Sequence, residues 1–394
     1  CSLDAREGEI VKKIDSEIEL ALSRLADRPI LKFNRSQLLV SGKETFRSIF
    51  DAIDAAKEYV LIEFFIIQDD KLGLELKKCL IRKAREKVRV YFLYDEIGSY
   101  ALSDTYLENM AQEGIVISSF GTTRGRANRF QLNFRNHRKI VVVDGVSAFV
   151  GGHNVGDEYI SGHPRLGPWR DTHIKVEGPV VQAVQFAFVE DWYWATTDIP
   201  ELNWELRKAE NGVEDALLIP SGPADQIETC GLMFTQAINS AKKRIWISSP
   251  YFVPDRQILA ALKLAALRGV DVRILIPEKA DHRTVHLASY SFYPNVIPAG
   301  VKLYRYKPGF MHQKVFLVDS IAAAVGTANL DNRSFRLNFE LTLLIFNSGF
   351  VKEVETMLQK DFENSRLVAL EEYTNRRLPF RLAVRLASLL SPIL

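Results

Sequence analysis

Two short segments of the chain carry the same set of reactive side chains. The segments 137–144 and 312–319 each read His-x-Lys, then four apolar residues, then Asp. Side chains alternate along a strand, so a histidine and a lysine two residues apart are expected on the same face of a strand. Each copy therefore offers one imidazole beside one ammonium group, namely His137 with Lys139 and His312 with Lys314.

The repetition extends well beyond these two motifs. Each motif histidine is followed fourteen residues later by a glycine and seventeen residues later by an asparagine, which are Gly151 and Asn154 in the first copy and Gly326 and Asn329 in the second. Strand-like apolar runs also recur at matching places, 59–65 with 244–250, 88–92 with 272–276 and 169–174 with 338–343. Repetition on this scale predicts two similar α/β half-domains that share one site.

The chemistry that suits two His-Lys pairs is phosphoryl transfer. Two ammonium groups would repel a metal ion, whereas lysine binds phosphoryl oxygens well, and Asn154 and Asn329 can donate further hydrogen bonds to them. Two copies can clamp one phosphodiester and stabilise its developing charge. One imidazole would attack phosphorus while the other acts as general acid and base. We expect no metal and no cofactor.

Each histidine also needs an acceptor that orients it. Asp171 and Glu340 occupy equivalent positions of the repeat, so either could accept a hydrogen bond from a ring nitrogen and raise that ring's pKa. We assign Glu340 to His312. The motif aspartates Asp144 and Asp319 lie seven residues after their histidines, an odd offset that places them off the histidine face, so we expect a structural role in the turn that follows.

These motifs resemble those of the phospholipase D superfamily. The flanking segments 151–159, 169–173, 249–255 and 326–334 are similar to bacterial cardiolipin synthases, and the likeness covers about residues 30 to 394. It implies an α/β fold of two similar half-domains, each a mixed, mostly parallel sheet flanked by helices, related by a pseudo-twofold axis around one shared active site. It also implies that His137 is the nucleophile and His312 the acid/base, and it counts Asp144 and Asp319 in the catalytic motif.

The same resemblance implies a reaction and its partners. The reaction is phosphatidyl transfer between two phosphatidylglycerol molecules, giving cardiolipin and glycerol through a phosphatidyl-histidine intermediate. The implied partners are anionic phospholipid (phosphatidylglycerol and cardiolipin), a membrane surface and a second copy in a homodimer, at the cytoplasmic side of a bacterial inner membrane. The alternatives are a phospholipase D hydrolase, a phosphatidylserine synthase-like transferase, a nuclease, and an inactive lipid-binding scaffold.

Composition narrows these alternatives. The chain has 394 residues, enough for two domains, and its 51 basic and 49 acidic residues leave a net charge of +2, which argues against nucleic acid as partner. Its three cysteines show no disulfide or metal-ligand spacing, as expected for a reducing compartment. No uncharged apolar run reaches the roughly 18 residues of a spanning helix. Cys1 could be the first residue of a lipid-modified mature protein or could follow a removed segment. Related synthases usually begin with hydrophobic membrane segments, so we expect the second.

The chain divides into four predicted parts. Residues 1–29 carry an amphipathic helix at about 8–26, residues 30–205 and 206–370 form the two phospholipase D-like domains, and residues 371–394 form a basic amphipathic tail. Residues 196–216 are the predicted linker, and helices are predicted at 44–57, 72–86, 178–195, 224–242 and 255–268.

Three further segments carry polar groups of interest. The insert 121–136 overlaps the segment 124–139, which contains six basic residues and no acidic residue. This segment predicts an anion-attracting rim beside the first motif. The tail has four arginines among apolar residues, which favours a helix lying on an anionic membrane over a helix docked on the domain. His282 and His286 are four apart, but no Glu completes a metal site, so we expect them to line the cleft or pack.

Overall fold

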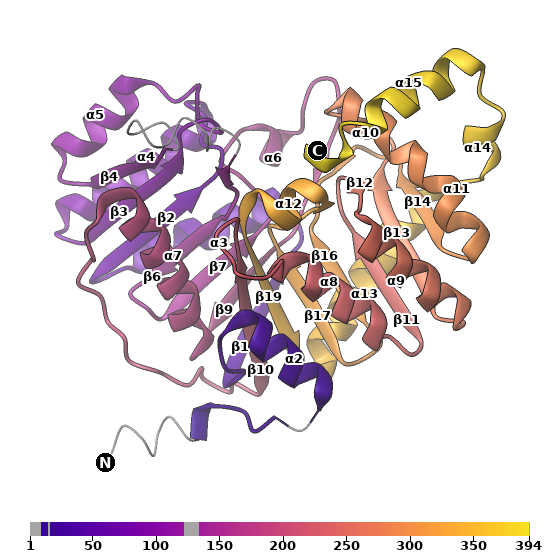
Figure 1. The fold of residues 1–394 in the computed structure, drawn as a ribbon. Helices are drawn as coiled ribbons and strands as arrows, with labels where there is room; N and C mark the ends of the chain where they lie inside the picture. Colours follow the sequence, from indigo (N-terminus) through magenta and orange to yellow (C-terminus); the bar gives the residue numbers. More distant parts are fainter. Residues whose placement is uncertain (1–8, 15, 122–133, 394) are drawn as a thin grey trace.

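The computed structural model describes residues 9–14, 16–121 and 134–393. This part of the chain is an α/β fold in which one long mixed sheet runs through the molecule and helices cover both faces (Figure 1). Up to residue 205 the helices are α2 (Glu17–Ala26), α3 (Gly42–Ala55), α4 (Lys71–Arg85), α5 (Asp104–Gln112), α6 (Glu158–Ser161) and α7 (Val180–Thr196). The strands there are β1 (Leu31–Leu39), β2 (Tyr59–Phe64), β3 (Arg89–Asp95), β4 (Val116–Phe120), β5 (Arg135–Asn136), β6 (Ile140–Val143), β7 (Ser147–Gly151), β8 (Trp169–Arg170) and β9 (His173–Glu177).

The second half repeats this plan. Its helices are α8 (Thr229–Ser240), α9 (Arg256–Leu267), α10 (Arg283–Ser289), α11 (Tyr293–Val296), α12 (Asn332–Arg336), α13 (Ser348–Glu363), α14 (Glu371–Thr374) and α15 (Leu378–Ser388). Its strands are β10 (Glu214–Ser221), β11 (Arg244–Ser248), β12 (Phe252–Val253), β13 (Asp271–Pro277), β14 (Lys302–Tyr306), β15 (Phe310–Met311), β16 (Val315–Val318), β17 (Ala322–Gly326), β18 (Leu330–Asp331), β19 (Asn338–Phe346) and β20 (Ser365–Leu367).

The order of strands reads the same outward from the centre of the sheet. β1 and β10 pair antiparallel in the middle. Outward from β1 come β9, β7, β6, β2, β3 and β4, and outward from β10 come β19, β17, β16, β11, β13 and β14, with β20 at the edge. The predicted pair of similar α/β half-domains is thus confirmed. Parallel pairing within this sheet is mostly at its outer strands and the centre is antiparallel, so antiparallel pairing is more extensive than predicted.

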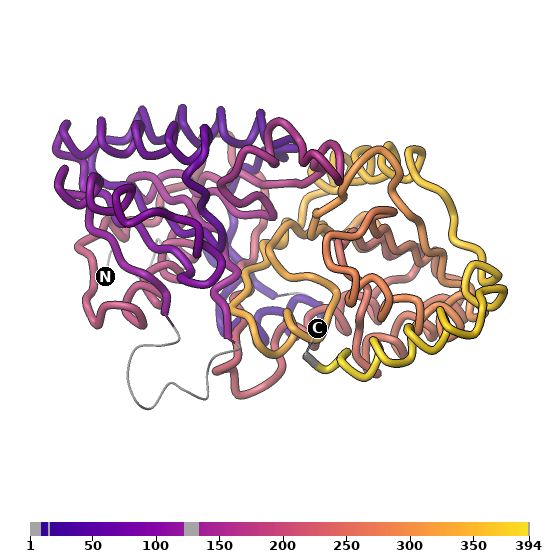
Figure 2. The backbone as a smooth tube through the Cα atoms, turned by 90° about the horizontal axis from the view of Figure 1, so that it is seen from above, coloured from indigo at the N-terminus to yellow at the C-terminus, as the bar shows by residue number. Residues whose placement is uncertain are grey.

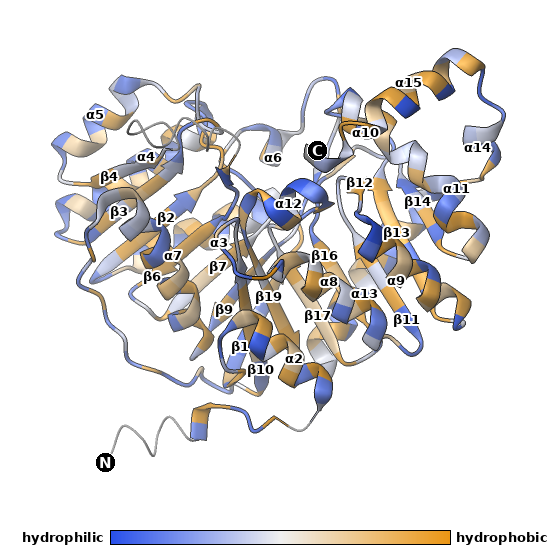
Figure 3. Cartoon of the chain, in the orientation of Figure 1, coloured by the Kyte–Doolittle hydropathy of each residue, from blue (hydrophilic) through white to orange (hydrophobic). Residues whose placement is uncertain are grey.

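The sheet is buried on both faces, which explains why its strands read as continuous apolar runs. All six residues of β2 are buried. On one face, α7 and α13 pack on a core that includes residues of both halves. On the other face, α3 and α4 cover the first half, and α8, α9 and α2 cover the second. In Figure 3 the strands are mostly hydrophobic and their connections hydrophilic.

Local capping decides where the helices begin. The side chains of Ser41, Asp70, Ser103 and Asp255 each accept a hydrogen bond from a backbone N–H in the first turn of their helix. Ser16 does the same for α2, so that helix begins at Glu17 rather than near residue 8 as predicted. Val11 instead bridges to Leu31. The predicted linker 196–216 also ends early, because its last residues belong to β10 at the centre of the sheet.

The two His-x-Lys segments lie just before strands rather than on them, which corrects the prediction. Residues 137–139 link β5 to β6, and residues 312–314 link β15 to β16. β5 pairs with β19 of the second half, while β15 pairs with β8 of the first half. Each motif is therefore attached to the opposite half of the molecule. Seen from above, the two halves lie side by side, with the first half on the left and the second on the right, and they meet near the centre of the view (Figure 2).

The motif aspartates lie in the turns at the far ends of β6 and β16, as predicted. Both have a left-handed backbone conformation, with φ of 53° at Asp144 and 51° at Asp319. The Asp319 carboxylate accepts backbone hydrogen bonds of 2.8–2.9 Å from Lys242, Lys243 and Arg244. Asp144 does the same at 2.8 Å for three consecutive residues, Lys57, Glu58 and Tyr59. These contacts support a structural role rather than a catalytic one.

The C-terminal segment folds back on the second half. α15 packs against α10, and Val384 and Ala387 on one side of α15 are buried. Among residues 9–14, 16–121 and 134–393, the structure has no helix with the length and apolar character required to span a bilayer.

We expect Asp319→Ala to lower the free energy of unfolding by about 2 kcal/mol or more, because three partly buried N–H groups lose a charged acceptor. The measurement is chemical denaturation of the variant beside Glu353→Ala, an exposed carboxylate on α13 that should change stability by less than about 0.5 kcal/mol. Normal stability together with lost turnover would contradict the structural role.

Candidate active site

The two motif histidines are each held by an acid from the opposite half. His137 Nδ1 lies 2.9 Å from Glu340 Oε2, and His312 Nδ1 lies 2.7 Å from Asp171 Oδ2. The prediction that these two acids orient the histidines agrees with this geometry, but the assignment of Glu340 to His312 was wrong. The reason is strand pairing, because β5 beside β19 places His137 opposite Glu340. The equivalent pairing of β8 and β15 places His312 opposite Asp171.

Backbone hydrogen bonds fix both segments at this crossing. The N–H of His137 donates to the Phe339 carbonyl at 3.0 Å, and the N–H of His312 donates to the Arg170 carbonyl at 2.7 Å. Aromatic rings pack beside each imidazole, with the Phe65 centroid 5.0 Å from that of His137 and the Trp169 centroid 5.5 Å from that of His312. Neither ring was among the residues predicted for the site.

The two acids have different surroundings. Glu340 is fully buried and accepts hydrogen bonds from neutral donors, which are Thr327 Oγ1 at 2.6 Å, Ser334 Oγ at 2.8 Å and Asn338 Nδ2 at 3.0 Å. Asp171 occupies the space where a side chain on Gly152 would stand, since a Cβ there would lie 2.0 Å from Asp171 Oδ1. The sequence repeat indicates this difference, because the position directly after the repeated glycine is Gly152 in the first copy and Thr327 in the second.

Both imidazoles are almost fully buried, and burial favours their neutral form. Burial lowers the pKa of His137 to about 4, although the Glu340 carboxylate opposes the shift. Burial and then the Lys314 ammonium lower the pKa of His312, against the raising effect of Asp171. A neutral ring that donates Nδ1–H to an acid leaves the Nε2 lone pair free. Each ring is thus prepared to act as a nucleophile or a base.

The two lysines are more deeply buried than expected for fixed cations. Burial lowers the pKa of Lys139 to about 7 and that of Lys314 to about 8. Each ammonium donates to the carbonyl of its own histidine two residues earlier. Lys314 also lowers the pKa of His137 and of Lys139, so the two motifs interact across the boundary between the halves. Buried cations of this kind are stabilised by a bound anion.

Two arginines hold the backbone that carries the orienting acids. Arg138 Nη1 lies 2.9 Å from both carboxylate oxygens of Asp191 on α7, and Arg138 Nε donates to the Glu340 carbonyl at 3.1 Å. Arg170 makes a two-pronged pair of 3.0 and 2.8 Å with Asp361 on α13 and donates to the Asp171 carbonyl at 2.9 Å. The helices α7 and α13 follow equivalent strands, so the repeat duplicates this arrangement as well.

The predicted basic rim is only partly described. Arg124, Arg126 and Arg129 lie outside the described residues. Arg138 and Lys139 were counted in the rim, but both are buried, and Arg138 is paired with Asp191. For these two residues the prediction was wrong, because partners distant in the sequence place them inside the molecule.

The motif asparagines differ in their contacts. Asn154 Oδ1 accepts from the Ile66 N–H at 3.1 Å, and Asn154 Nδ2 donates to the Tyr159 hydroxyl at 2.8 Å. Asn329 Oδ1 is buried without a hydrogen-bond partner among the described residues. Phosphate binding by these two asparagines stays a prediction.

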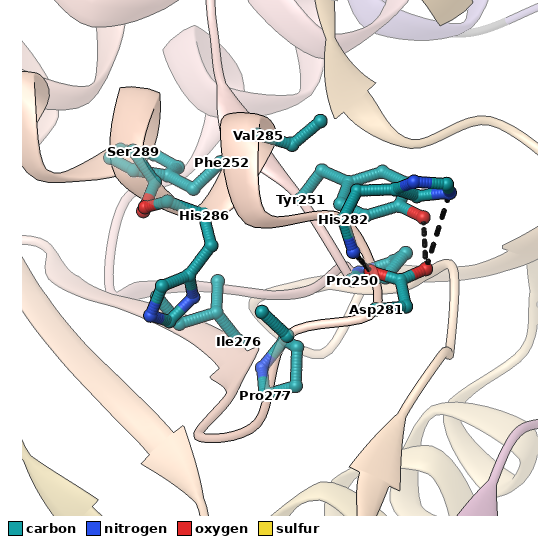
Figure 4. A pocket seen from close by; sticks show the side chains of 11 residues that line it. Pro250, Tyr251, Phe252, Ile276, Pro277, Asp281, His282, Val285, His286 and Ser289 are labelled. Atoms are coloured by element: carbon teal, nitrogen blue, oxygen red, sulfur yellow. Dashed lines mark hydrogen bonds and ion pairs between the residues drawn. The ribbon is translucent and has the colours of Figure 1, made fainter. Parts of the chain in front are cut away.

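A cavity beside the second motif is lined by residues of β12, α10 and the loop before it (Figure 4). Tyr251 donates its hydroxyl proton to Asp281 at 2.6 Å, and the Asp281 carboxylate raises the pKa of His312. His282 and His286 both line this cavity, whereas a place in the wall of the substrate cleft stays a prediction. Among the described residues no group of three potential ligands could hold a metal ion.

We expect Glu340→Gln to change the ring-nitrogen signals of His137 alone and Asp171→Asn those of His312 alone, because each amide disturbs the tautomer of the ring it touches. Nitrogen-detected spectra of the seven histidines measure this. Turnover should fall about a hundredfold or more in each variant. Glu353→Gln on the exposed face of α13 is the control, and a His312 response to Glu340→Gln would contradict the crossed pairing.

We expect dimethyl phosphate, a diester that stays singly charged, to bind about tenfold or more weakly at pH 9 than at pH 6. The reason is that Lys139 and Lys314, with pKa values of about 7 and about 8, lose their charge over this range. Calorimetric titration at several pH values tests this, with exposed Lys352→Gln as the control. An affinity independent of pH would contradict the role of these lysines.

Comparison with known proteins agrees with this geometry. The family model described as "Cardiolipin synthase, PLD-like domain" matches residues 49–164 and 234–362. A protein named cardiolipin synthase A from Pseudomonas putida is 52% identical over 393 residues, covering 100% of this chain and 80% of the relative. Another from Pseudomonas entomophila is 53% identical over 374 residues, or 95% of this chain and 78% of the relative.

A solved structure supports the fold. The phosphatidylserine synthase of Haemophilus influenzae superimposes with a TM-score of 0.73 over 96% of this chain and 100% of that one, at 16% identity. At this identity the likeness concerns the fold alone. The family match contains both histidine motifs, and the relatives align over the whole chain. The chain therefore belongs to the cardiolipin synthase family of phospholipase D-like proteins.

Proposed function

We propose that this protein is a phosphatidyltransferase that makes cardiolipin and glycerol from two phosphatidylglycerol molecules. The observation that carries the proposal is the pair of crossed histidine–acid contacts, His137 with Glu340 and His312 with Asp171, in a chain about 52% identical to proteins named cardiolipin synthase A. Two neutral imidazoles and two lysines around one site fit a double displacement at a phosphodiester.

We assign His137 as the nucleophile and His312 as the acid/base. His137 has its pKa lowered to about 4 by burial, so its Nε2 lone pair is free at neutral pH. Burial and Lys314 lower the pKa of His312, but two carboxylates, Asp171 and Asp281, raise it. These carboxylates favour the protonated form of His312, which the acid/base has to adopt during the reaction. Burial would raise the pKa of Asp171, but the neighbouring Lys314 ammonium and the contact with His312 outweigh burial and hold that pKa well below its usual range.

The reaction then has two balanced steps. In the first, His137 Nε2 attacks phosphorus of one phosphatidylglycerol and the bond to the glycerol oxygen breaks. His312, which enters this step protonated on Nε2, gives that proton to the departing glycerol. In the second, His312 takes the proton of a hydroxyl group on another phosphatidylglycerol, whose oxygen attacks phosphorus and releases His137. One phosphodiester replaces another, so no cofactor is required. Lys139 and Lys314 stabilise the charge on the phosphoryl oxygens in both steps.

Other acceptors define the alternatives. Water in the second step would give phosphatidic acid, which is the phospholipase D reaction, and serine would give phosphatidylserine. The likeness to a phosphatidylserine synthase structure concerns only the fold and does not favour that acceptor. A nuclease is disfavoured by the net charge of +2. An inactive lipid-binding scaffold would not need both His-Lys pairs with their orienting acids.

We place the protein at the surface of a bacterial inner membrane, on its cytoplasmic side, because its proposed substrates and product are membrane phospholipids. The relatives are bacterial, and the two cysteines that the structure describes, Cys79 and Cys230, are free thiols. Free thiols are usual in a reducing compartment.

We expect labelled phosphatidylglycerol in vesicles to give cardiolipin and glycerol, identified by mass. A phosphatidyl ester of p-nitrophenol tests the division of labour, because this leaving group needs no acid. His312→Ala should then accumulate phosphatidyl-enzyme on His137 up to one equivalent, since the base for the second step is missing.

The controls separate the outcomes. His137→Ala should form no covalent adduct, and Glu353→Ala, on the exposed face of α13, should turn over as the native protein does. Phosphatidic acid as the sole product would overturn the transferase reading. An adduct on His312 in the His137→Ala protein would reverse the assigned roles.

A further inference from the structure

The helix α15 has two faces with different surroundings. Phe380, Val384 and Ala387 point toward the second half, where Val384 is fully buried and Phe380 packs 5.2 Å from the Tyr290 ring. The opposite face and the residue that follows the helix carry four leucines at intervals of three and four residues. These are Leu378, Leu382, Leu386 and Leu389, which are 77%, 56%, 59% and 75% exposed.

This leucine face is more than scattered surface apolarity. Single exposed apolar residues are normal, but four on one side of a helix form a contiguous patch, and such patches mark interaction sites. Figure 3 shows α15 with alternating hydrophobic and hydrophilic segments at the edge of the molecule. Of the two alternatives for the tail, docking on the domain agrees with the structure, and the membrane-surface role stays a prediction that the open face permits.

Charge indicates what covers the leucine face. On a helical wheel Arg377, Arg381 and Arg385 lie between the leucine face and the docked face, and Arg385 is exposed. No acidic residue occurs between Tyr373 and Leu394. Arginines beside an apolar face match an anionic phospholipid surface, where leucines enter the acyl boundary and guanidinium groups contact phosphates. A second copy with the same basic edge would be repelled.

The helix is also fastened to the elements around the second motif. Ala387 packs with Val253 of β12 and Ala288 of α10, two elements that line the cavity beside that motif. Asn332, three residues after Asn329, donates its side-chain amide to the carbonyl of Ser391 at 3.0 Å, just beyond α15. Figure 1 shows α15, in yellow at the upper right, beside α10.

We propose that the leucine face of α15 is the docking surface for an anionic phospholipid bilayer. The inference rests on the proposed function in one respect, since the docked bilayer would supply the phosphatidylglycerol substrates. Because α15 is fastened to α10 and α12, docking places the second motif and its cavity beside the membrane. A lipid headgroup then reaches the site without its acyl chains leaving the bilayer.

The test compares vesicle binding of three double variants. Leu382→Asn with Leu386→Asn should lower partitioning onto vesicles of 30% phosphatidylglycerol and 70% phosphatidylcholine at least tenfold. Arg377→Gln with Arg385→Gln should lower it about tenfold on these vesicles, with little change on pure phosphatidylcholine. The matched control is Leu264→Asn with Leu267→Asn on α9, which are 56% and 71% exposed and should bind as the native protein does.

Turnover of a short-chain phosphatidylglycerol below its micelle concentration separates docking from chemistry. The leucine variant should keep native turnover of this soluble substrate, which also shows that it is folded. Native vesicle binding by the leucine variant would overturn the proposal. A leucine variant whose only change is a smaller oligomer in light scattering would also overturn it, because the leucine face would then be a contact between copies of the chain. Leucine-dependent vesicle binding by a protein that makes no cardiolipin would support the docking surface and overturn the proposed function.

Discussion

The crossed histidine–acid contact is the constraint on which the rest of the structure depends. Each motif imidazole contacts a carboxylate from the other half, His137 with Glu340 and His312 with Asp171, and such a contact orients the ring. Neither half can therefore form a complete site alone. The continuous sheet through β1 and β10, together with the pairings β5–β19 and β8–β15, holds the two halves in the one arrangement in which both contacts form.

The duplication is close in the backbone and less so in the polar groups. Glu340 rests on neutral donors that include Thr327 and Ser334, whereas Asp171 fills the space left by Gly152 and lies near Lys314. Both acids lie near a lysine, but Glu340 also accepts hydrogen bonds from three neutral side chains, Thr327, Ser334 and Asn338. His137 and His312 occupy equivalent positions of the repeat but lie beside different acids. This difference allows the two rings to carry different charges during one reaction, as a double displacement requires.

The sequence was sufficient for features that depend on local spacing, and insufficient for those that depend on pairing between distant strands. The repeat predicted two half-domains, and the odd offset of Asp319 from His312 predicted its place in a turn. The partner of each acid depends on which strands meet across the halves, and no local pattern encodes that register. Arg138 illustrates the same limit, because its basic neighbours suggested the surface while Asp191, far along the chain, holds it inside.

Burial explains how one site can both bind a charged lipid headgroup and disfavour water. Lys139 is fully buried, and His137 and His312 are only 8% and 7% exposed, so little solvent reaches the reacting groups. In such surroundings the lysine charges are costly without an anion and strongly effective with one. A bound phosphodiester would therefore stabilise the charged form of both lysines. Under the proposed reaction, the second step uses the alcohol that is present at the highest local concentration as the acceptor. Beside a bilayer that alcohol is a lipid.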